Sequence, residues 1–259
     1  MTAPLDMAAG TDRGRLRLHN EDCLAAIAES GFAVLADGMG GHNAGEVASR
    51  MAVEVISSGI EAVVRAGGAE HLDSAGAELL ITERIAHANA RIYEAGHSRR
   101  EYAGMGTTIV VALWRNATVT IGHIGDSRMY RMRAGELKQL THDHSLAQEH
   151  VDRGILSADE ARIASIRNIL TRTVGNALQV TAELNSFDVV ADDLYLLCSD
   201  GLTDMLTDEQ IGQAMISFGA EVQQAVDQLI QQANDQGGAD NVSVILVRVV
   251  SALERGRGE

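Results

Sequence analysis

Two hydrophobic periodicities alternate along the first half of the chain. Apolar residues spaced by about four positions predict amphipathic helices over residues 43–66 and 74–95. Residues 23–38 instead indicate two strands joined by a Glu29-Ser30-Gly31 turn. After this the period changes to two, and short apolar runs over residues 107–140 predict a meander of antiparallel strands. Strands therefore surround a central pair of helices.

The second half of the chain begins with a polar segment and returns to strands and helices. Residues 142–176 have the composition of a surface excursion, a type of segment that often borders an active site. Strands follow, and Thr207 with Gln210 can form the capping box of a helix. A further helix can end at Gly237-Gly238 before a final strand over residues 241–250. This order predicts an α+β fold, with sheets sandwiched between helical layers.

Composition indicates one domain in a soluble, cytoplasmic chain. The 259 residues are 46% hydrophobic, no Pro- or Ser-rich linker divides them, and the two cysteines, Cys23 and Cys198, look like core residues. There is no signal-peptide pattern and no apolar run of about 18 residues, so no membrane partner is expected. The formal net charge of -15 argues against nucleic acid as a partner. Acidity usually reflects solubility alone, but it can also reflect carboxylates gathered to hold cations.

Acidic residues stand beside Gly, Ser or Asn at the margins of four predicted strands, namely Asp37, Asp126, Asp200 and Asp240. Glu21 and Asp22 lead into another strand. If these strand ends converge, mutual repulsion raises the pKa values of the carboxyl groups unless a positive charge intervenes. Mg²⁺ and Mn²⁺ prefer such oxygen ligands. The four glycines within eight positions after Asp37 let the backbone turn sharply near an ion.

Turn formation is the main alternative reading of these sites. Asp-Gly is a common turn dipeptide, and any one of the acidic residues taken alone is more often part of a turn than of a metal site. Independent turns give no reason, however, for "DGMGG", "GDSR", "SDG" and "DN" to occur together in this order. The ordered set therefore carries the functional interpretation.

The complete series of motifs resembles a known family. The segments "RLRLHNED", "ADGMGGHNAGEVAS", "GTT", "HIGDSRMYR", "LTHDHS", "LTRTVG", "CSDGLTDML" and "DNVSVILV" are similar to those of the metal-dependent serine/threonine protein phosphatases of type 2C, in their compact bacterial form. The resemblance runs from about Gly14 to Val250. It implies a four-layer α-β-β-α sandwich, in which two antiparallel sheets are flanked by helix pairs. It also implies one catalytic domain over residues 1–259, with a core at about 12–250 and a flap insertion at about 142–175.

The resemblance assigns a metal-binding role to most of the acidic residues. Asp37 resembles the ligand that bridges two ions, and Glu21 and the Gly38 carbonyl resemble ligands of the second ion. Asp200 and Asp240 resemble ligands of the first. A hydroxide bridging the two Mn²⁺ or Mg²⁺ ions would then attack phosphorus in line.

Further residues are expected around this pair of ions. Asp126, with Asp200, resembles the site of a third and weaker ion. Asp22 and Asn241 are expected to orient the ligands from behind. His123 is expected to pack near the site rather than react.

Two side chains are candidates for handling the phosphate and its leaving group. Arg17 matches the phosphate-binding arginine, and its planar fork suits two phosphate oxygens. The alternative is that Arg13, Arg15 and Arg17 simply alternate on an exposed strand. Met39 replaces the histidine that serves as general acid in eukaryotic members. His42, three residues further on, is a candidate acid, and metal-bound water is the alternative.

Three hypotheses for function follow. The first is an active phosphoserine/phosphothreonine protein phosphatase, expected to be a monomer, that opposes a bacterial serine/threonine kinase. The second is a catalytically weak, phosphoprotein-binding regulatory module of the same fold. The third is a domain in which cations only stabilise the fold. The flap carries Ser145, Arg153, Arg162, Arg167 and Arg172, and the sequence gives no ranking among them as contacts for phosphoprotein substrates.

Overall fold

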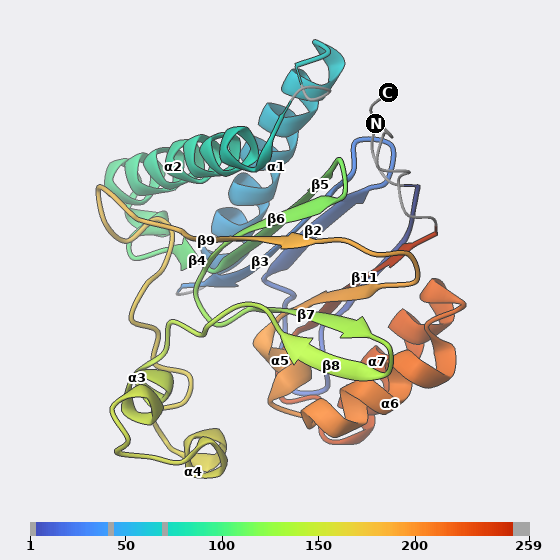
Figure 1. The fold of residues 1–259 in the computed structure, drawn as a ribbon. Helices are drawn as coiled ribbons and strands as arrows, with labels where there is room; N and C mark the ends of the chain where they lie inside the picture. The colour runs from blue at the N-terminus through green and yellow to red at the C-terminus, as the bar shows by residue number, and fades with distance from the viewer. Residues whose placement is uncertain (1–3, 41–43, 69–71, 251–259) are drawn as a thin grey trace.

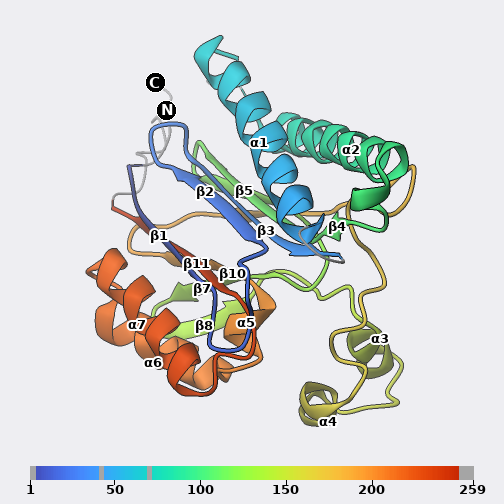
Figure 2. The ribbon, with the colours of Figure 1, turned by 180° about the vertical axis from the view of Figure 1, so that it is seen from behind.

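Two β-sheets stack face to face between two groups of helices (Figure 1, Figure 2). The computed structural model describes residues 4–40, 44–68 and 72–250. Helices α1 (Ala44–Arg65) and α2 (Ser74–Ser98) cover one sheet. Helices α6 (Asp208–Phe218) and α7 (Val222–Asp235) cover the other. The predicted α-β-β-α sandwich is confirmed.

The sheet under α1 and α2 has six antiparallel strands in the described residues, ordered β2-β3-β5-β6-β9, with β4 paired to β3. Its strands are β2 (Asp22–Ile27), β3 (Phe32–Met39), β4 (Gly106–Thr107), β5 (Ile109–Arg115), β6 (Thr118–Ile124) and β9 (Glu183–Asp188). The predicted turn at residues 29–31 joins β2 to β3. Their register places Asp22 opposite Asp37.

The sheet under α6 and α7 has the order β1-β11-β10-β7-β8. Its strands are β1 (Leu5–Asp12), β7 (Arg128–Arg133), β8 (Glu136–Gln139), β10 (Leu194–Cys198) and β11 (Val242–Val249). Strand β11 lies between two partners, as its nearly continuous apolar sequence indicates. Strand β1 was not predicted, because its Ala-Ala-Gly centre is poor in strand-forming residues, and pairing with β11 along its whole length supplies the missing preference.

The predicted meander over residues 107–140 is wrong in one respect, because its two hairpins lie in different sheets. Strands β5 and β6 pair in the six-stranded sheet, whereas β7 and β8 pair in the other. The chain crosses between the sheets at Gly125, whose φ is 105°. A period of two identifies strands but does not say which sheet a hairpin joins. The crossing places Asp126 at the junction of the two sheets.

The helices begin and end close to the predicted positions. Asp73 caps α2 by accepting a hydrogen bond from the Gly76 N–H, and the predicted capping box of Thr207 and Gln210 begins α6. The shorter helices are a 3₁₀ turn (Arg100–Tyr102), α3 (Leu146–Asp152), α4 (Ala158–Ile163) and α5 (Asp200–Thr203). Within the described residues, no helix combines the length and apolarity needed to cross a bilayer.

Three apolar layers hold the sandwich together. Ile56 and Ile81 pack between the six-stranded sheet and its helices, and Leu229 and Leu246 pack on the opposite side of the molecule. Between the sheets, Trp114 meets another aromatic ring edge to face at a centroid distance of 5.7 Å. Each such buried side chain contributes roughly 1.5–3 kcal/mol. The rigid layers fix the strand ends that carry the acidic residues.

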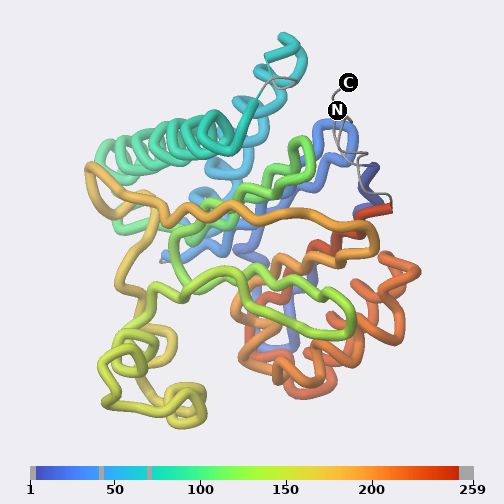
Figure 3. The backbone as a smooth tube through the Cα atoms, in the orientation of Figure 1, coloured from blue at the N-terminus to red at the C-terminus, as the bar shows by residue number. Residues whose placement is uncertain are grey.

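Residues 142–175, hereafter the flap, project from the sandwich and contain α3 and α4 (Figure 3). The entering and leaving segments pair with each other, since the Thr171 N–H donates to the His144 carbonyl at 2.8 Å and Ser145 bridges to Leu170. The flap is therefore tied at its base, beside the junction of the sheets.

Candidate metal centre

A cavity of about 420 Å³ lies where strand ends of both sheets meet, and it gathers residues from seven separate parts of the sequence. The predicted site residues that line it are Arg17, Glu21, Asp37, Gly38, Asp126, Asp200, Asp240 and Asn241. Asp22 lies outside the lining, behind Asp37. His42 lies outside the described residues. The convergence of the acidic residues, on which the functional interpretation depends, is thus present in the structure.

Asp37 is fixed through its own backbone. Its N–H donates to Thr108 Oγ1 at 3.0 Å, and its carbonyl accepts hydrogen bonds from the Thr107 hydroxyl and the Thr108 N–H. Thr108 Oγ1 in turn lies 2.7 Å from the Ser127 hydroxyl, next to Asp126. These bonds couple two acidic residues through side chains that belong to the "GTT" and "GDSR" motifs. Their role depends on tertiary contacts that no local pattern reports.

Asn241 joins the first loop of the chain to the start of β11. Its Oδ1 accepts a hydrogen bond from the Glu21 N–H at 2.8 Å, and its Nδ2 donates to the Arg13 and His19 carbonyls. Arg17 in this loop donates to Asp240 at 2.5 Å. Residues 13–20 form no strand, so the alternative of arginines alternating along a strand is wrong. Asn241 therefore places Arg17 and Glu21 at the cavity.

The carboxyl groups raise one another's pKa values. Burial, followed by repulsion from neighbouring carboxylates, raises the pKa of Asp37 and of Asp200 well above the ordinary value. Burial raises the pKa of Asp126 to about 7, with Asp143 adding to the effect, and burial raises that of Asp22 to about 6. Crowded carboxylates of this kind require compensating positive charge to remain ionised.

The donor set fits divalent cations. Glu21 Oε1 and Asp200 Oδ1 are buried oxygens without a hydrogen-bond partner among the described residues. Such oxygens are costly unless another group satisfies them. Hard cations such as Mg²⁺ and Mn²⁺ accept carboxylate and carbonyl ligands with several waters. The cavity therefore has the chemistry of a metal centre.

Two glycines keep this centre open. A Cβ on Gly38 would stand 2.1 Å from the Gly45 carbonyl oxygen, and a Cβ on Gly45 would stand 2.8 Å from Glu21 Oε1. Both positions therefore require the absence of a side chain, because the chain segments there approach one another too closely for a Cβ atom.

Gly38→Ala is expected to destabilise the protein by about 1–3 kcal/mol, because the clash is with backbone that has little room to move. Thermal unfolding followed by circular dichroism measures this. Gly212→Ala is the matched control, since a Cβ there meets only ordinary contacts at 3.6 Å or more and α6 gains helix propensity. A Gly38 variant as stable as the Gly212 variant would contradict the assigned close approach.

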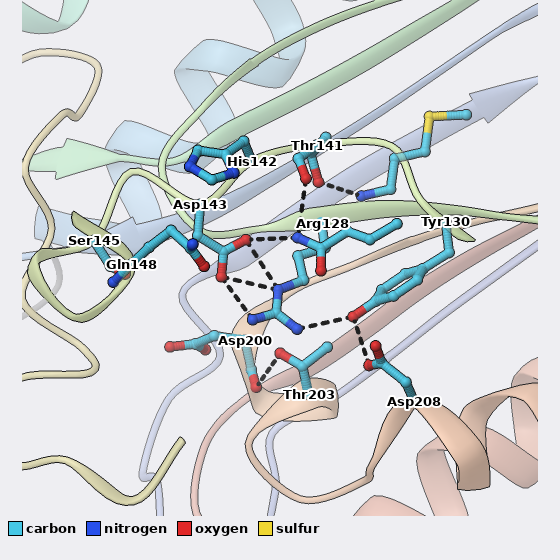
Figure 4. Close-up of polar contacts among 12 residues, drawn as sticks. Arg128, Tyr130, Thr141, His142, Asp143, Ser145, Gln148, Asp200, Thr203 and Asp208 are labelled. Carbon is cyan, nitrogen blue, oxygen red and sulfur yellow. Dashed lines mark hydrogen bonds and ion pairs between the residues drawn. The ribbon is translucent and has the colours of Figure 1, made fainter. Parts of the chain in front are cut away.

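A buried ion pair supports the cavity from the side of the flap (Figure 4). Arg128 donates to both Asp143 oxygens, with the closest contact at 2.7 Å, and to the Tyr130 hydroxyl at 2.9 Å. The Tyr130 hydroxyl donates to Asp208. The bidentate geometry fixes the first residues of the flap against β7, two residues after Asp126.

A second group of possible ligands lies at the base of the flap. One atom each of His123, His144 and Glu183 lie within 4.8 Å of one another. His144 Nδ1 already accepts a hydrogen bond from the Gly125 N–H, so the neutral ring carries its proton on Nε2 and has no free lone pair. His123 stacks on His144 and bonds to the His142 carbonyl, which agrees with its predicted packing role. This group is therefore a poor cation site.

The sandwich and its acidic cavity define a class of protein, the hydrolases that use divalent cations to attack phosphate esters. The family model described as Protein phosphatase 2C matches residues 9–243. The chain thus belongs to the protein phosphatase 2C family of metal-dependent serine/threonine protein phosphatases.

Named relatives span nearly the whole chain. It is 35% identical over 250 residues to the serine/threonine phosphatase stp of Listeria welshimeri, a match that covers 95% of this chain and 96% of the relative. The crystal structure of the Mycobacterium tuberculosis serine/threonine phosphatase PstP/Ppp is similar with a TM-score of 0.85 and 35% identity, covering 95% and 98% of the two chains. A crystal structure of the PstP catalytic domain in complex with two manganese ions has a TM-score of 0.84 and 34% identity, covering 95% and 99%.

Proposed function

We propose that this chain hydrolyses phosphoserine and phosphothreonine in proteins with two Mn²⁺ or Mg²⁺ ions held in the cavity. The observation that carries the proposal is the convergence of Glu21, Asp37, Asp200 and Asp240 on one cavity beside Arg17. Asp37, Asp200 and Asp240 would hold the first ion, and Asp37, Glu21 and the Gly38 carbonyl would hold the second. Asp126 and Asp200 would hold a third, weaker ion.

The chain's own residues bind and orient the phosphoprotein. Two divalent cations in the cavity supply an activated water at neutral pH and positive charge for the phosphate. Arg17 binds the phosphate oxygens, because its side chain is 52% exposed and its ion pair with Asp240 uses only one of its two terminal nitrogens. Asp22 and Asn241 keep the ligands oriented from behind. His42 is our candidate proton donor to the seryl or threonyl oxygen.

The location and the partners of the enzyme are inferred from the class of phosphatase that the sequence predicts. We infer that the enzyme acts as a monomer in the cytoplasm on phosphoproteins made by a bacterial serine/threonine kinase, and that it binds neither nucleic acid nor membrane. Hydrolysis of p-nitrophenyl phosphate and of a phosphothreonine peptide, each with and without Mn²⁺, tests the reaction. Binding of the peptide without any metal-dependent release of phosphate would favour the regulatory module. An increase in the stability of the fold with Mn²⁺, without any peptide binding, would favour a structural cation site.

Arg17→Ala is expected to lower kcat/KM for p-nitrophenyl phosphate by about 10- to 100-fold, the effect of losing a charge-assisted hydrogen bond of about 1.5–3 kcal/mol. Arg15→Ala is the control, since Arg15 is exposed in the same loop and does not line the cavity. Steady-state kinetics at saturating Mn²⁺ measure both. Equal losses in the two variants would show that Arg17 is a solvated charge and not a phosphate ligand.

A further inference from the structure

A second cavity continues from the metal centre along the segment that follows the flap. It measures about 550 Å³ and is lined by residues 171–173, 176, 177 and 179–181. Residues 171–173 and Asn176 also line the metal centre. The two cavities therefore adjoin, and the second lies between the metal centre and the start of β9.

The wall of this second cavity is firmly held, yet it leaves backbone groups unused. Asn89, which is 2% exposed, donates to the Ala177 carbonyl at 3.0 Å and accepts a hydrogen bond from the Gly175 N–H at 2.7 Å. Within the described part of the chain, residues 179–182 make no hydrogen bonds to other backbone groups. Backbone groups of this kind are available to an extended polypeptide lying alongside.

The structure ranks the arginines of the flap region by their partners. Arg153 pairs with Glu149 at 3.5 Å, and Arg167 pairs with Asp204 at 3.4 Å. Neither Arg162 nor Arg172 forms an ion pair with a described carboxylate, but Arg172 lines both the metal centre and the second cavity, whereas Arg162 lines neither. An unpaired guanidinium in a cleft is a ready ligand for an anion.

The side chain next to Arg172 is His144, and it does not accept a hydrogen bond from the Arg172 guanidinium. The Arg172 Nη1 lies 3.3 Å from Nε2 of His144, but that nitrogen carries the ring proton because Nδ1 accepts from Gly125. The proton instead faces Glu183, whose Oε2 is 3.5 Å away. Burial lowers the pKa of His144 to about 4, with the charge of Arg172 contributing, so the ring is neutral and does not repel the guanidinium. The N–H groups of Arg172 thus remain available to a ligand.

We propose that Arg172 binds an anionic side chain of the substrate, a carboxylate or a second phosphate near the phosphoresidue under attack, while the flanking polypeptide lies extended along residues 176–181. This inference rests on the proposed function and adds a substrate preference to it. Arg172 is on this account a specificity-determining residue, because it contacts the flanking chain rather than the phosphate that is cleaved.

Peptide kinetics in Mn²⁺ test the proposal. The substrates to be compared are phosphothreonine peptides. They carry Glu, a second phosphothreonine, Ala or Lys at each position up to about four residues from the phosphothreonine that is cleaved. The wild type is expected to prefer an anionic flank by about tenfold in kcat/KM, mainly through KM, as one charge-assisted hydrogen bond provides. The Glu and phosphothreonine arms identify which anion is favoured.

Two variants give readouts that a merely structural role would not produce. Arg172→Ala should reduce the preference ratio to about one, and Arg172→Glu should reverse it toward the Lys peptides. Arg153→Ala, the matched control on the flap, should keep the wild-type ratio.

Ala177→Trp, which fills the second cavity, should raise KM for peptides more than Leu178→Trp, whose side chain is exposed and lies outside the cavity lining.

A wild type indifferent to flanking charge, or a preference that survives Arg172→Glu, would overturn the proposal. Failure of the wild type to hydrolyse even p-nitrophenyl phosphate in Mn²⁺ would contradict the proposed function instead. In that case peptide binding by fluorescence polarisation still decides the role of Arg172, through the same comparison of anionic and neutral flanks.

Discussion

Asp37→Asn is expected to lower kcat/KM for phosphothreonine peptides by at least about three orders of magnitude. Loss of the carboxylate proposed to bridge both cations removes several kcal/mol of stabilisation from the reaction. The amide has nearly the same shape, and Asp37 is held through its backbone by Thr107 and Thr108, so the fold should survive. Steady-state kinetics over a range of Mn²⁺ concentrations measure the effect.

The control for this experiment is Asp227→Asn. Asp227 is exposed on α7 and accepts a hydrogen bond only from Gln223 among the described residues. Its replacement should leave kcat/KM unchanged within about twofold, since surface substitutions away from a site have small effects. Full activity of the Asp37 variant at saturating Mn²⁺ would show that the two-ion assignment is wrong.

Mn²⁺ is expected to raise the melting temperature by about 5–10 °C at pH 8 when present at about 100 times its Kd, and by much less at pH 5. The raised pKa values of about 6 for Asp22 and about 7 for Asp126 mean that the metal-free fold favours protonated carboxyl groups. Their contribution to stability is present below the unfolded value near 4 and is lost as the pH rises through 6 and 7. Cations replace the lost protons.

Differential scanning calorimetry with Mn²⁺ or with EDTA at each pH measures this dependence. The comparison is between the two increments, so effects of pH on the rest of the protein cancel. Asp37→Asn should reduce the increment at pH 8, whereas Asp227→Asn should keep it. An Mn²⁺ increment that is the same at pH 5 and pH 8 would contradict the proposed carboxylate site.

The layered fold was predicted from local patterns, whereas the convergence of the acidic residues was predicted from the resemblance to a known family. Helices α1 and α2 follow from apolar spacing, and the capping box at Thr207 marks the start of α6. The strand ends that carry Asp37 and Asp200 are marked by apolar runs that stop at a carboxylate. Their order along the chain matches a family pattern, which supplies the topology that periodicity alone does not contain.

The remainder depends on contacts between distant segments. The crossing at Gly125 moved one hairpin to the other sheet, and strand β1 forms only because β11 pairs with it. Hydrogen bonds join residues far apart in sequence where Thr108 fixes Asp37 and where Asn241 positions the first loop. Among the arginines of the flap, Arg172 is distinguished by lining both cavities and by forming no ion pair with a described carboxylate. No periodicity or motif reports such partners.

Anomalous diffraction from crystals grown with Mn²⁺ tests the central claim most directly. We predict two strong manganese peaks in the cavity, both contacting Asp37, with Asp200 and Asp240 on one ion and Glu21 with the Gly38 carbonyl on the other. A cavity without manganese, or a peak only at His123, His144 and Glu183, would contradict the account.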